Sequence, residues 1–209
     1  MMQHSALLLL LVACTSSAPS AAPAPSATPS AASSPSAAPT VNAGAPERLT
    51  TVEVGSGLSV VVLLHGYGAA GDDLVRLARG LEAQVPARYI LPAAPIPMDH
   101  GGRRWFGRRA EGSTEAERGR AHTLVAALLD DLVQDGVRRE DIVLGGFSQG
   151  AMLTMDVARE ERVGAVAFLS GATLPGWGDW AQLRGIPVLM SHGRQDAVLP
   201  FEEAETLSH

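Results

Sequence analysis

Short apolar runs alternate with amphipathic stretches along the chain from position 47 onwards. The run 58–64 (LSVVVLL) lies between glycines and is almost entirely apolar, which is typical of a strand buried on both faces. Runs of the same character predict further strands at 88–91, 142–147, 163–170 and 187–191, with a candidate edge strand at 51–54.

Between these runs, apolar side chains recur at spacings of three and four residues, which predicts helices. The pattern covers 72–83 (Leu74, Leu77, Ala78, Leu81) and 115–134 (Leu124, Ala127, Leu128, Leu132). Gly136 follows the second segment as a helix stop. The alternation of strands and helices predicts the α/β class, with a mostly parallel central sheet and helices on both faces.

Charge divides the chain into two parts. Residues 1–46 contain no Asp, Glu, Lys or Arg, so all 16 basic and 22 acidic residues lie in 47–209. We expect 47–209 to be one folded domain, since a domain of this size buries roughly 70% of the surface of its unfolded chain. The net charge of -6 argues against a nucleic-acid partner, which requires a basic face.

The first 14 residues have the pattern of an export signal. Five leucines at 7–11 are followed by Val12, Ala13 and Cys14, the only cysteine of the chain. This end resembles the bacterial lipobox, in which the cysteine is acylated, although His4 is the only basic side chain before the leucines. We expect 1–14 to be a lipoprotein-type signal peptide and the protein to be exported and anchored to a membrane of the bacterial cell envelope. The alternative is an ordinary signal peptide with a chance cysteine.

Residues 15–46 have the composition of a tether. Ala, Pro, Ser and Thr make up 29 of these 32 residues, seven of them proline. So little apolar surface cannot offset the entropy of ordering, and we expect a disordered linker.

The clearest chemical motif is Gly146-Phe147-Ser148-Gln149-Gly150. It joins the strand predicted at 142–147 to a helical stretch at 151–159, which is the context of a GxSxG nucleophile elbow. The sharp turn lifts the serine above the sheet, and the helix N-terminus favours an oxyanion. We predict Ser148 as a nucleophile. The alternative is a serine that caps the helix.

An oxyanion hole needs a second loop after an earlier central strand, and His65-Gly66-Tyr67-Gly68 occupies that position. We predict the backbone N–H groups of Tyr67 and Gln149 as its donors. His65 is interpreted as a structural histidine bonded to backbone rather than as a catalytic base.

A candidate acid follows the strand predicted at 187–191. Asp196 lies 48 residues after Ser148, in a glycine-containing loop at the same predicted sheet edge. The order serine, then acid, is that of α/β-hydrolases. The alternative role of Asp196 is to cap the helix that begins near Pro200.

Together, four stretches resemble the phospholipase/carboxylesterase family that includes acyl-protein thioesterases, which has the α/β-hydrolase fold. They are LLHGYGAAGDDL (63–74), LPAAPIPMDHGGRRWF (91–106), GGFSQGAML (145–153) and SHGRQDAVLP (191–200). The resemblance implies Ser148 as nucleophile, Asp196 as triad acid, and Tyr67 with Gln149 as oxyanion donors. It also implies that Trp105 and Phe106 lie near the acyl-binding cleft, although both could equally be core residues.

One element of the family pattern is missing. The catalytic histidine should follow Asp196 by roughly thirty residues, after another helix and strand, whereas the chain ends at His209. A helix over 202–208 would carry His209 away from the acid loop, and His122 and His192 are also poor candidates. We therefore expect a C-terminally incomplete hydrolase domain that lacks its last strand and helix. A longer reading frame would test this expectation.

These observations predict a serine hydrolase that cleaves carboxylic esters or thioesters through an acyl-Ser148 intermediate. The main alternative is a non-catalytic lipoprotein of the same fold that binds an acyl group or another small ligand. A peptidase is a weaker alternative, because one fold and triad serve many reactions. No cofactor is implied, since the histidines and acids do not form a metal-ligand spacing such as HExxH.

Overall fold

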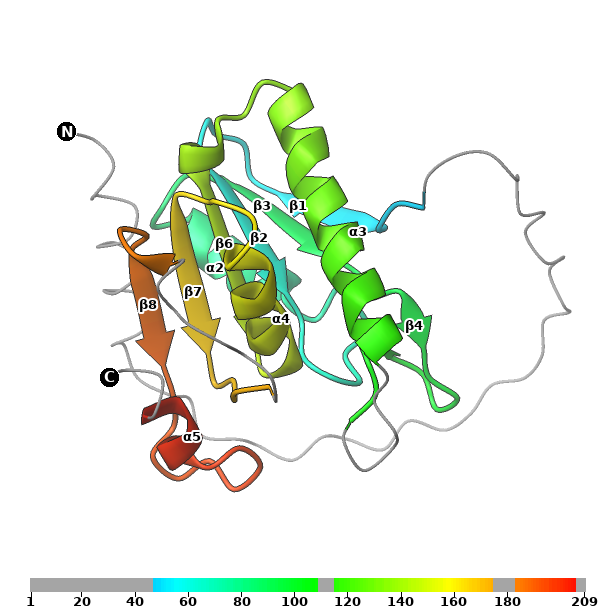
Figure 1. The fold of residues 1–209 in the computed structure, drawn as a ribbon. Coiled ribbons are helices and arrows are strands. Elements are labelled where there is room, and N and C mark those ends of the chain that lie inside the picture. The colour runs from blue at the N-terminus through cyan, green and yellow to red at the C-terminus, as the bar shows by residue number, and fades with distance from the viewer. Residues whose placement is uncertain (1–46, 109–114, 175–182, 206–209) are drawn as a thin grey trace, which may run out of the picture.

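The computed structural model describes residues 47–108, 115–174 and 183–205, and a six-stranded sheet forms its centre (Figure 1). In spatial order the strands are β1 (Thr51–Val54), β3 (Arg88–Pro92), β2 (Val60–Leu64), β6 (Ile142–Phe147), β7 (Ala165–Leu169) and β8 (Val188–Ser191). Strand β1 is antiparallel to β3, and the other neighbours are parallel. The predicted strands are therefore all present, including the edge strand at 51–54.

Strand β2 shows why its sequence is apolar throughout. Val60, Val62 and Leu64 belong to one buried cluster, whereas Val61 and Leu63 belong to a second cluster on the opposite face of the sheet. Alternate side chains of a strand point to opposite faces, so a strand covered on both sides needs apolar residues at every position.

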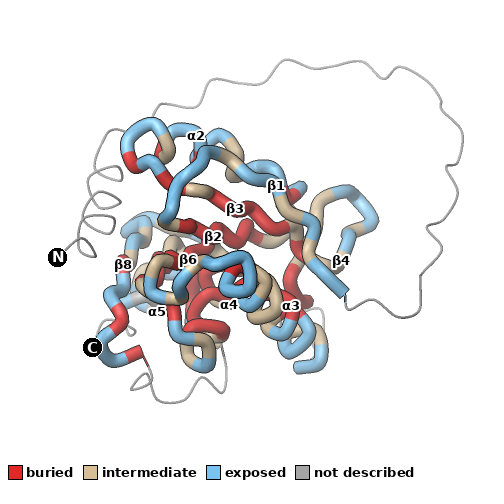
Figure 2. The backbone as a smooth tube through the Cα atoms, turned by 90° about the horizontal axis from the view of Figure 1, so that it is seen from above, coloured by how far each residue is buried: buried red, intermediate tan, exposed pale blue. Residues whose placement is uncertain are grey.

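Helices cover the two faces of the sheet (Figure 2). Helices α3 (Glu115–Gln134) and α4 (Gln149–Ala158) lie on one face, and α2 (Val75–Glu82) lies on the other, against β1 and β3. A short helix α5 (Phe201–Glu205) follows β8, and a 3₁₀ turn η2 (Arg139–Asp141) precedes β6. The helix predicted over 115–134 has these bounds in the structure, and Gly136 follows it with φ +92°.

Several boundaries differ from the prediction by one to three residues. The strand predicted from position 58 begins at Val60 and leaves Leu58 95% exposed, because pairing with β3 and β6 starts at Val60. Strand β7 is shorter than 163–170, and α2 begins at Val75 rather than at position 72. The small hairpin of β4 (Ile96–Pro97) and β5 (Arg103–Arg104) was not predicted, since two-residue strands show no periodicity.

The predicted signal peptide and linker lie outside the described residues. Within the described ranges, no helix combines the length and the apolar character that crossing a bilayer requires.

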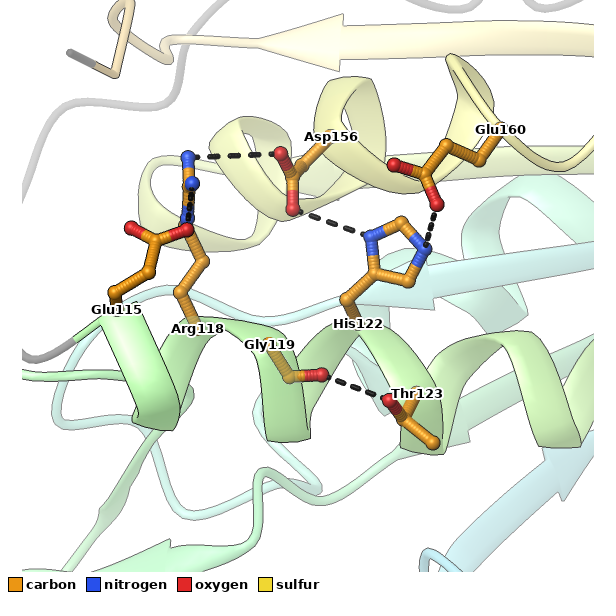
Figure 3. Close-up of polar contacts among 7 residues, drawn as sticks. All are labelled: Glu115, Arg118, Gly119, His122, Thr123, Asp156 and Glu160. Atoms are coloured by element: carbon orange, nitrogen blue, oxygen red, sulfur yellow. Dashed lines mark hydrogen bonds and ion pairs between the residues drawn. The ribbon is translucent and has the colours of Figure 1, made fainter. Parts of the chain in front are cut away.

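A charged cluster lies between α3 and the C-terminal part of α4 (Figure 3). The ring of His122 on α3 lies between two carboxylates: its Nδ1 is 3.2 Å from Asp156 and its Nε2 is 3.4 Å from Glu160. Arg118 lies one turn earlier on α3 and also contacts Asp156, at 3.6 Å. The hydrogen bond that His122 Nδ1 donates to Asp156 raises the pKa of His122 above its usual value, although burial opposes the shift.

This cluster predicts a pH-dependent contribution to stability. Because the pKa of His122 is higher in the folded than in the unfolded chain, its stabilisation is complete below about pH 6.5 and is lost as the pH rises through the folded pKa. We expect His122→Gln to lower the free energy of unfolding by about 1–2 kcal/mol at pH 5.5 and by less at pH 8.5.

Urea denaturation at the two pH values measures this difference, with His100→Gln, at an exposed position, as the matched control. An equal loss for His122→Gln at both pH values would contradict the assignment.

Candidate active site

The carboxyl ends of β6, β7 and β8 lie side by side at one edge of the sheet (Figure 1). The N–H of Ser148 donates to Leu169 O at 2.9 Å, and that of Ser170 donates to Ser191 O at 2.8 Å. In open α/β sheets, ligands bind outside this edge. The structure therefore brings Ser148 and the loop that carries Asp196 to the edge where chemistry is expected, with one strand between them.

Ser148 occupies a strained turn between β6 and α4. Its backbone has φ 54° and ψ −117°, a conformation that side-chain-bearing residues rarely adopt and that costs on the order of 1–3 kcal/mol. Ser148 stands at the N-cap position of α4, but its hydroxyl makes no capping hydrogen bond. The capping alternative therefore does not account for the serine, because the residue best placed to cap the helix does not use its oxygen for that purpose.

The glycines of the motif allow the turn to be this tight. A Cβ atom on Gly146 would lie 2.3 Å from the carbonyl carbon of Gly150, and a Cβ on Gly150 would lie 2.1 Å from Leu64 O. Both distances are far below van der Waals contact. The first turn of α4 is thus packed directly on the backbone at the end of β2.

The loop after β2 runs beside the serine. A Cβ on Gly66 would lie 3.4 Å from the Cβ of Ser148 and 3.2 Å from the ring of Phe147. Tyr67 follows directly, and Gln149 begins α4, where a backbone N–H has no partner within the helix. One predicted oxyanion donor therefore lies in the loop beside Ser148 and the other directly after Ser148 at the start of α4, and their role remains a prediction.

His65 is bonded to backbone on both ring nitrogens. Nε2 accepts a hydrogen bond from Ala94 N at 3.0 Å, so Nδ1 carries the proton and donates to Gly66 O at 2.7 Å. The side chain is buried, and burial lowers its pKa. His65 is therefore a neutral structural histidine, as its sequence context predicted, and it ties the loop after β2, which carries the predicted oxyanion donor Tyr67, to Ala94 beyond the end of β3.

Trp105 and Phe106 pack in the core in this structure. Trp105 is fully buried, its indole N–H donates to His65 O at 2.9 Å, and its ring lies 5.3 Å from the ring of His65. Phe106 is 3% exposed in the same apolar cluster. Their predicted contact with an acyl group remains a prediction, whereas the structure shows that Trp105 supports the loop after β2 through His65.

Asp196 lies in the loop after β8. Its Oδ1 accepts hydrogen bonds from the N–H groups of Val198 and Leu199, at 2.9 and 3.0 Å, and these bonds lower the pKa of the carboxyl group. The two N–H groups thereby hold the ionised carboxylate of Asp196 in one orientation. A surface hollow of about 530 Å³ lies against this loop and is lined by Asp196 and the three residues before it.

Three of the four described histidines make contacts elsewhere, and the fourth, His100, is exposed. His65 is bonded to backbone, and His122 faces Asp156 on α4 and Glu160 just beyond the end of α4. The Nε2 of His192 donates to Leu199 O at 2.8 Å and lies 3.7 Å from Asp196 Oδ2, too far for a hydrogen bond. His209 lies outside the described residues. Within the described ranges, no histidine is hydrogen-bonded to the hydroxyl of Ser148.

Two features of the site were not predicted. Ser170, at the end of β7, has φ +47°, the other left-handed serine of the described chain. The side chain of Gln149 is 4% exposed and bonds the backbone at Trp105 and Phe106. The one available sequence signal for the second feature was a glutamine beside the predicted nucleophile, at the start of a mostly apolar helix. In the described part of the chain, no group of three or more His, Cys, Asp or Glu side chains could hold a metal ion.

Comparison with known proteins places this arrangement in a family. The model of the phospholipase/carboxylesterase family matches residues 55–209. An acyl-protein thioesterase 1 from Eremothecium gossypii is 31% identical over 168 residues, covering 70% of this chain and 69% of that protein. An acyl-protein thioesterase 1 homolog 2 from Dictyostelium discoideum is 32% identical over 175 residues, covering 72% and 75%.

Solved structures agree on the fold. The crystal structure of esterase PE8 is similar with a TM-score of 0.66 at 29% identity, covering 77% of this chain and 82% of that one. The Bacillus cereus carboxylesterase has the same TM-score at 24% identity, covering 80% and 79%. The mostly parallel sheet with helices on both faces is thus an α/β-hydrolase fold. Because the family model matches about three quarters of its length, the chain belongs to the phospholipase/carboxylesterase family.

Proposed function

We propose that this protein hydrolyses carboxylic esters or thioesters through an acyl-enzyme formed on Ser148. The observation that carries the proposal is the conformation of this serine, which is held at φ 54° between β6 and α4 with its hydroxyl unused by the helix. Backbone strain of this kind persists where the surrounding structure enforces it, and it clusters at functional sites. The related acyl-protein thioesterases and carboxylesterases support the same reaction class.

In the proposed reaction, Ser148 Oγ attacks the carbonyl carbon of the substrate and loses its proton to a general base. The negative charge on the carbonyl oxygen is stabilised by the N–H groups of Tyr67 and Gln149. The bond to the alcohol or thiol then breaks as the base returns the proton to the leaving group. Water repeats these steps on the acyl-Ser148 ester and releases the acid.

The base in this mechanism is a histidine oriented by Asp196. We assign it to a residue outside the described ranges, because His65, His122 and His192 are engaged in other contacts and His100 is an exposed residue of the turn between β4 and β5. Asp196 suits the orienting role, since its Oδ1 is fixed by two backbone N–H groups and its depressed pKa keeps it ionised near neutral pH.

Hydrolysis by the full-length gene product tests the function. A short p-nitrophenyl ester and the thioester of the same acyl group are expected to be cleaved, with comparison of kcat/KM giving the preference between them. Binding of the ester or acid without turnover would reject the proposal and favour a non-catalytic acyl-binding protein.

We also propose that the mature protein is lipid-anchored in the bacterial cell envelope through Cys14. The lone cysteine after Leu11-Val12-Ala13 supports this proposal, and two or more acyl chains give stable membrane attachment. Metabolic labelling with a palmitate analogue should mark the wild type and not Cys14→Ala, which should move to the soluble fraction. An unlabelled wild-type protein released after signal cleavage would show an ordinary export signal instead.

A further inference from the structure

The side chain of Gln149 makes a two-point contact with a distant part of the chain. Its Oε1 accepts a hydrogen bond from Trp105 N at 2.9 Å, and its Nε2 donates to Phe106 O at 2.6 Å. Because one partner is a donor and the other an acceptor, the amide can satisfy both in one orientation only. The side chain is 4% exposed, so an unmade bond here would not be replaced by bulk water.

The same segment is bonded to the oxyanion loop. Gly68 N donates to Arg103 O at 2.9 Å, and Arg103 N donates to Ala69 O at 2.8 Å. The indole N–H of Trp105 reaches His65 O at 2.9 Å. Residues 65–69 are therefore held on both sides of Tyr67 by residues 103–105, which are in turn held by Gln149.

We propose that the Gln149 side chain is a positioning group that sets the distance between the two halves of the oxyanion hole. One half is the N–H of Gln149 itself, and the other is the N–H of Tyr67. The residue after the nucleophile thus contributes twice: its backbone faces the substrate oxygen, and its amide fixes the opposite donor through residues 103–106. This inference rests on the proposed ester or thioester hydrolysis at Ser148.

The substitution Gln149→Met tests this link, because it keeps the length of the side chain and its backbone N–H but removes both hydrogen bonds. We expect kcat to fall about 10- to 100-fold with KM nearly unchanged, since the misplaced donor matters most when charge develops on the oxygen. The matched control is Gln84→Met on the exposed surface, where a glutamine bonds Gly80 O at 3.3 Å, and it should leave both constants unchanged.

Amide hydrogen exchange provides a readout that does not depend on turnover. In Gln149→Met, exchange at Trp105 should rise because its acceptor is gone, and exchange at Gly68 should rise with it because the constraint is transmitted. Amides inside β2, such as that of Val62, should keep their protection. If the variant does not fold, hydrogen exchange in the wild-type protein still tests the link. Rapid exchange of the Trp105 or Gly68 amide would show that these hydrogen bonds do not hold.

The outcomes separate this inference from the proposed function. If the wild type hydrolyses esters while Gln149→Met keeps its kcat or leaves exchange at Gly68 unchanged, the inference is wrong. If the wild type hydrolyses no ester or thioester, the proposed function fails. The link is then judged by hydrogen exchange alone: faster exchange at Gly68 in Gln149→Met supports it, and unchanged exchange overturns it. A fall in kcat at constant KM together with faster exchange at Gly68 supports both.

Discussion

Replacing Ser148 with alanine is expected to lower kcat for ester hydrolysis by roughly 10⁴- to 10⁶-fold, because the acyl group then has no oxygen to which it can be transferred. Alanine keeps the Cβ atom, so the backbone strain of the turn at φ 54° is the same in the variant as in the wild type. We therefore expect the free energy of unfolding to change by less than about 1 kcal/mol. Initial rates with a p-nitrophenyl ester and urea denaturation measure the two quantities.

Ser170→Ala is the matched control for this substitution. Ser170 also has a positive φ, +47°, and lies at the end of the neighbouring strand. Its variant should keep kcat within about tenfold of the wild type. If Ser148→Ala retained more than a few per cent of the activity, or if Ser170→Ala alone abolished it, the nucleophile would have been assigned to the wrong serine.

Gly150→Ala should have the second largest effect, through packing rather than chemistry. The added Cβ would lie 2.1 Å from Leu64 O and 2.6 Å from His65 O, which are backbone atoms and cannot rotate away. Helix α4 and the loop after β2 must separate to make room. We expect a loss of about 3 kcal/mol in stability, because overpacking in a rigid region costs about that much. We expect kcat to fall at least about 100-fold in molecules that still fold, since displacing the predicted oxyanion donors by about 1 Å lowers the rate by about that factor.

Gly80→Ala is the control, since a Cβ at this position in α2 meets no atom within 4 Å. Alanine is the better helix former, so this variant should gain about 0.5–1 kcal/mol and keep its activity. Urea denaturation and initial rates on both variants test the comparison. Normal activity and stability in Gly150→Ala would mean that the close approach of α4 to β2 does not exist.

The sequence was informative where one residue property determined the structure. Strands buried on both faces require uninterrupted apolar side chains, so β2 and β6 could be recognised from composition alone. The GxSxG context was equally direct, because a tight strand-to-helix turn excludes side chains at Gly146 and Gly150. His65 could be interpreted as structural because it lies at the end of a buried strand.

Long-range contacts between loops could not be predicted. Gln149 and Trp105 are 44 positions apart, and nothing in the local pattern of either residue indicates the other. The hairpin of β4 and β5 is too short for periodicity, although the backbone of Arg103 in β5 is hydrogen-bonded to Gly68 and Ala69 in the loop after β2. Charge patterns on α3 and α4 likewise did not reveal that His122 faces Asp156, since the register between two helices depends on how both pack on the sheet.

A fluorophosphonate reagent tests the central claim most directly, because it reacts with an activated serine and leaves a stable adduct whose position tandem mass spectrometry can locate. The full-length protein should gain one phosphonyl group, on the peptide that contains Ser148, and lose its esterase activity in proportion to labelling. An adduct on Ser170 or another residue, or esterase activity that persists after Ser148 is fully labelled, would contradict the account.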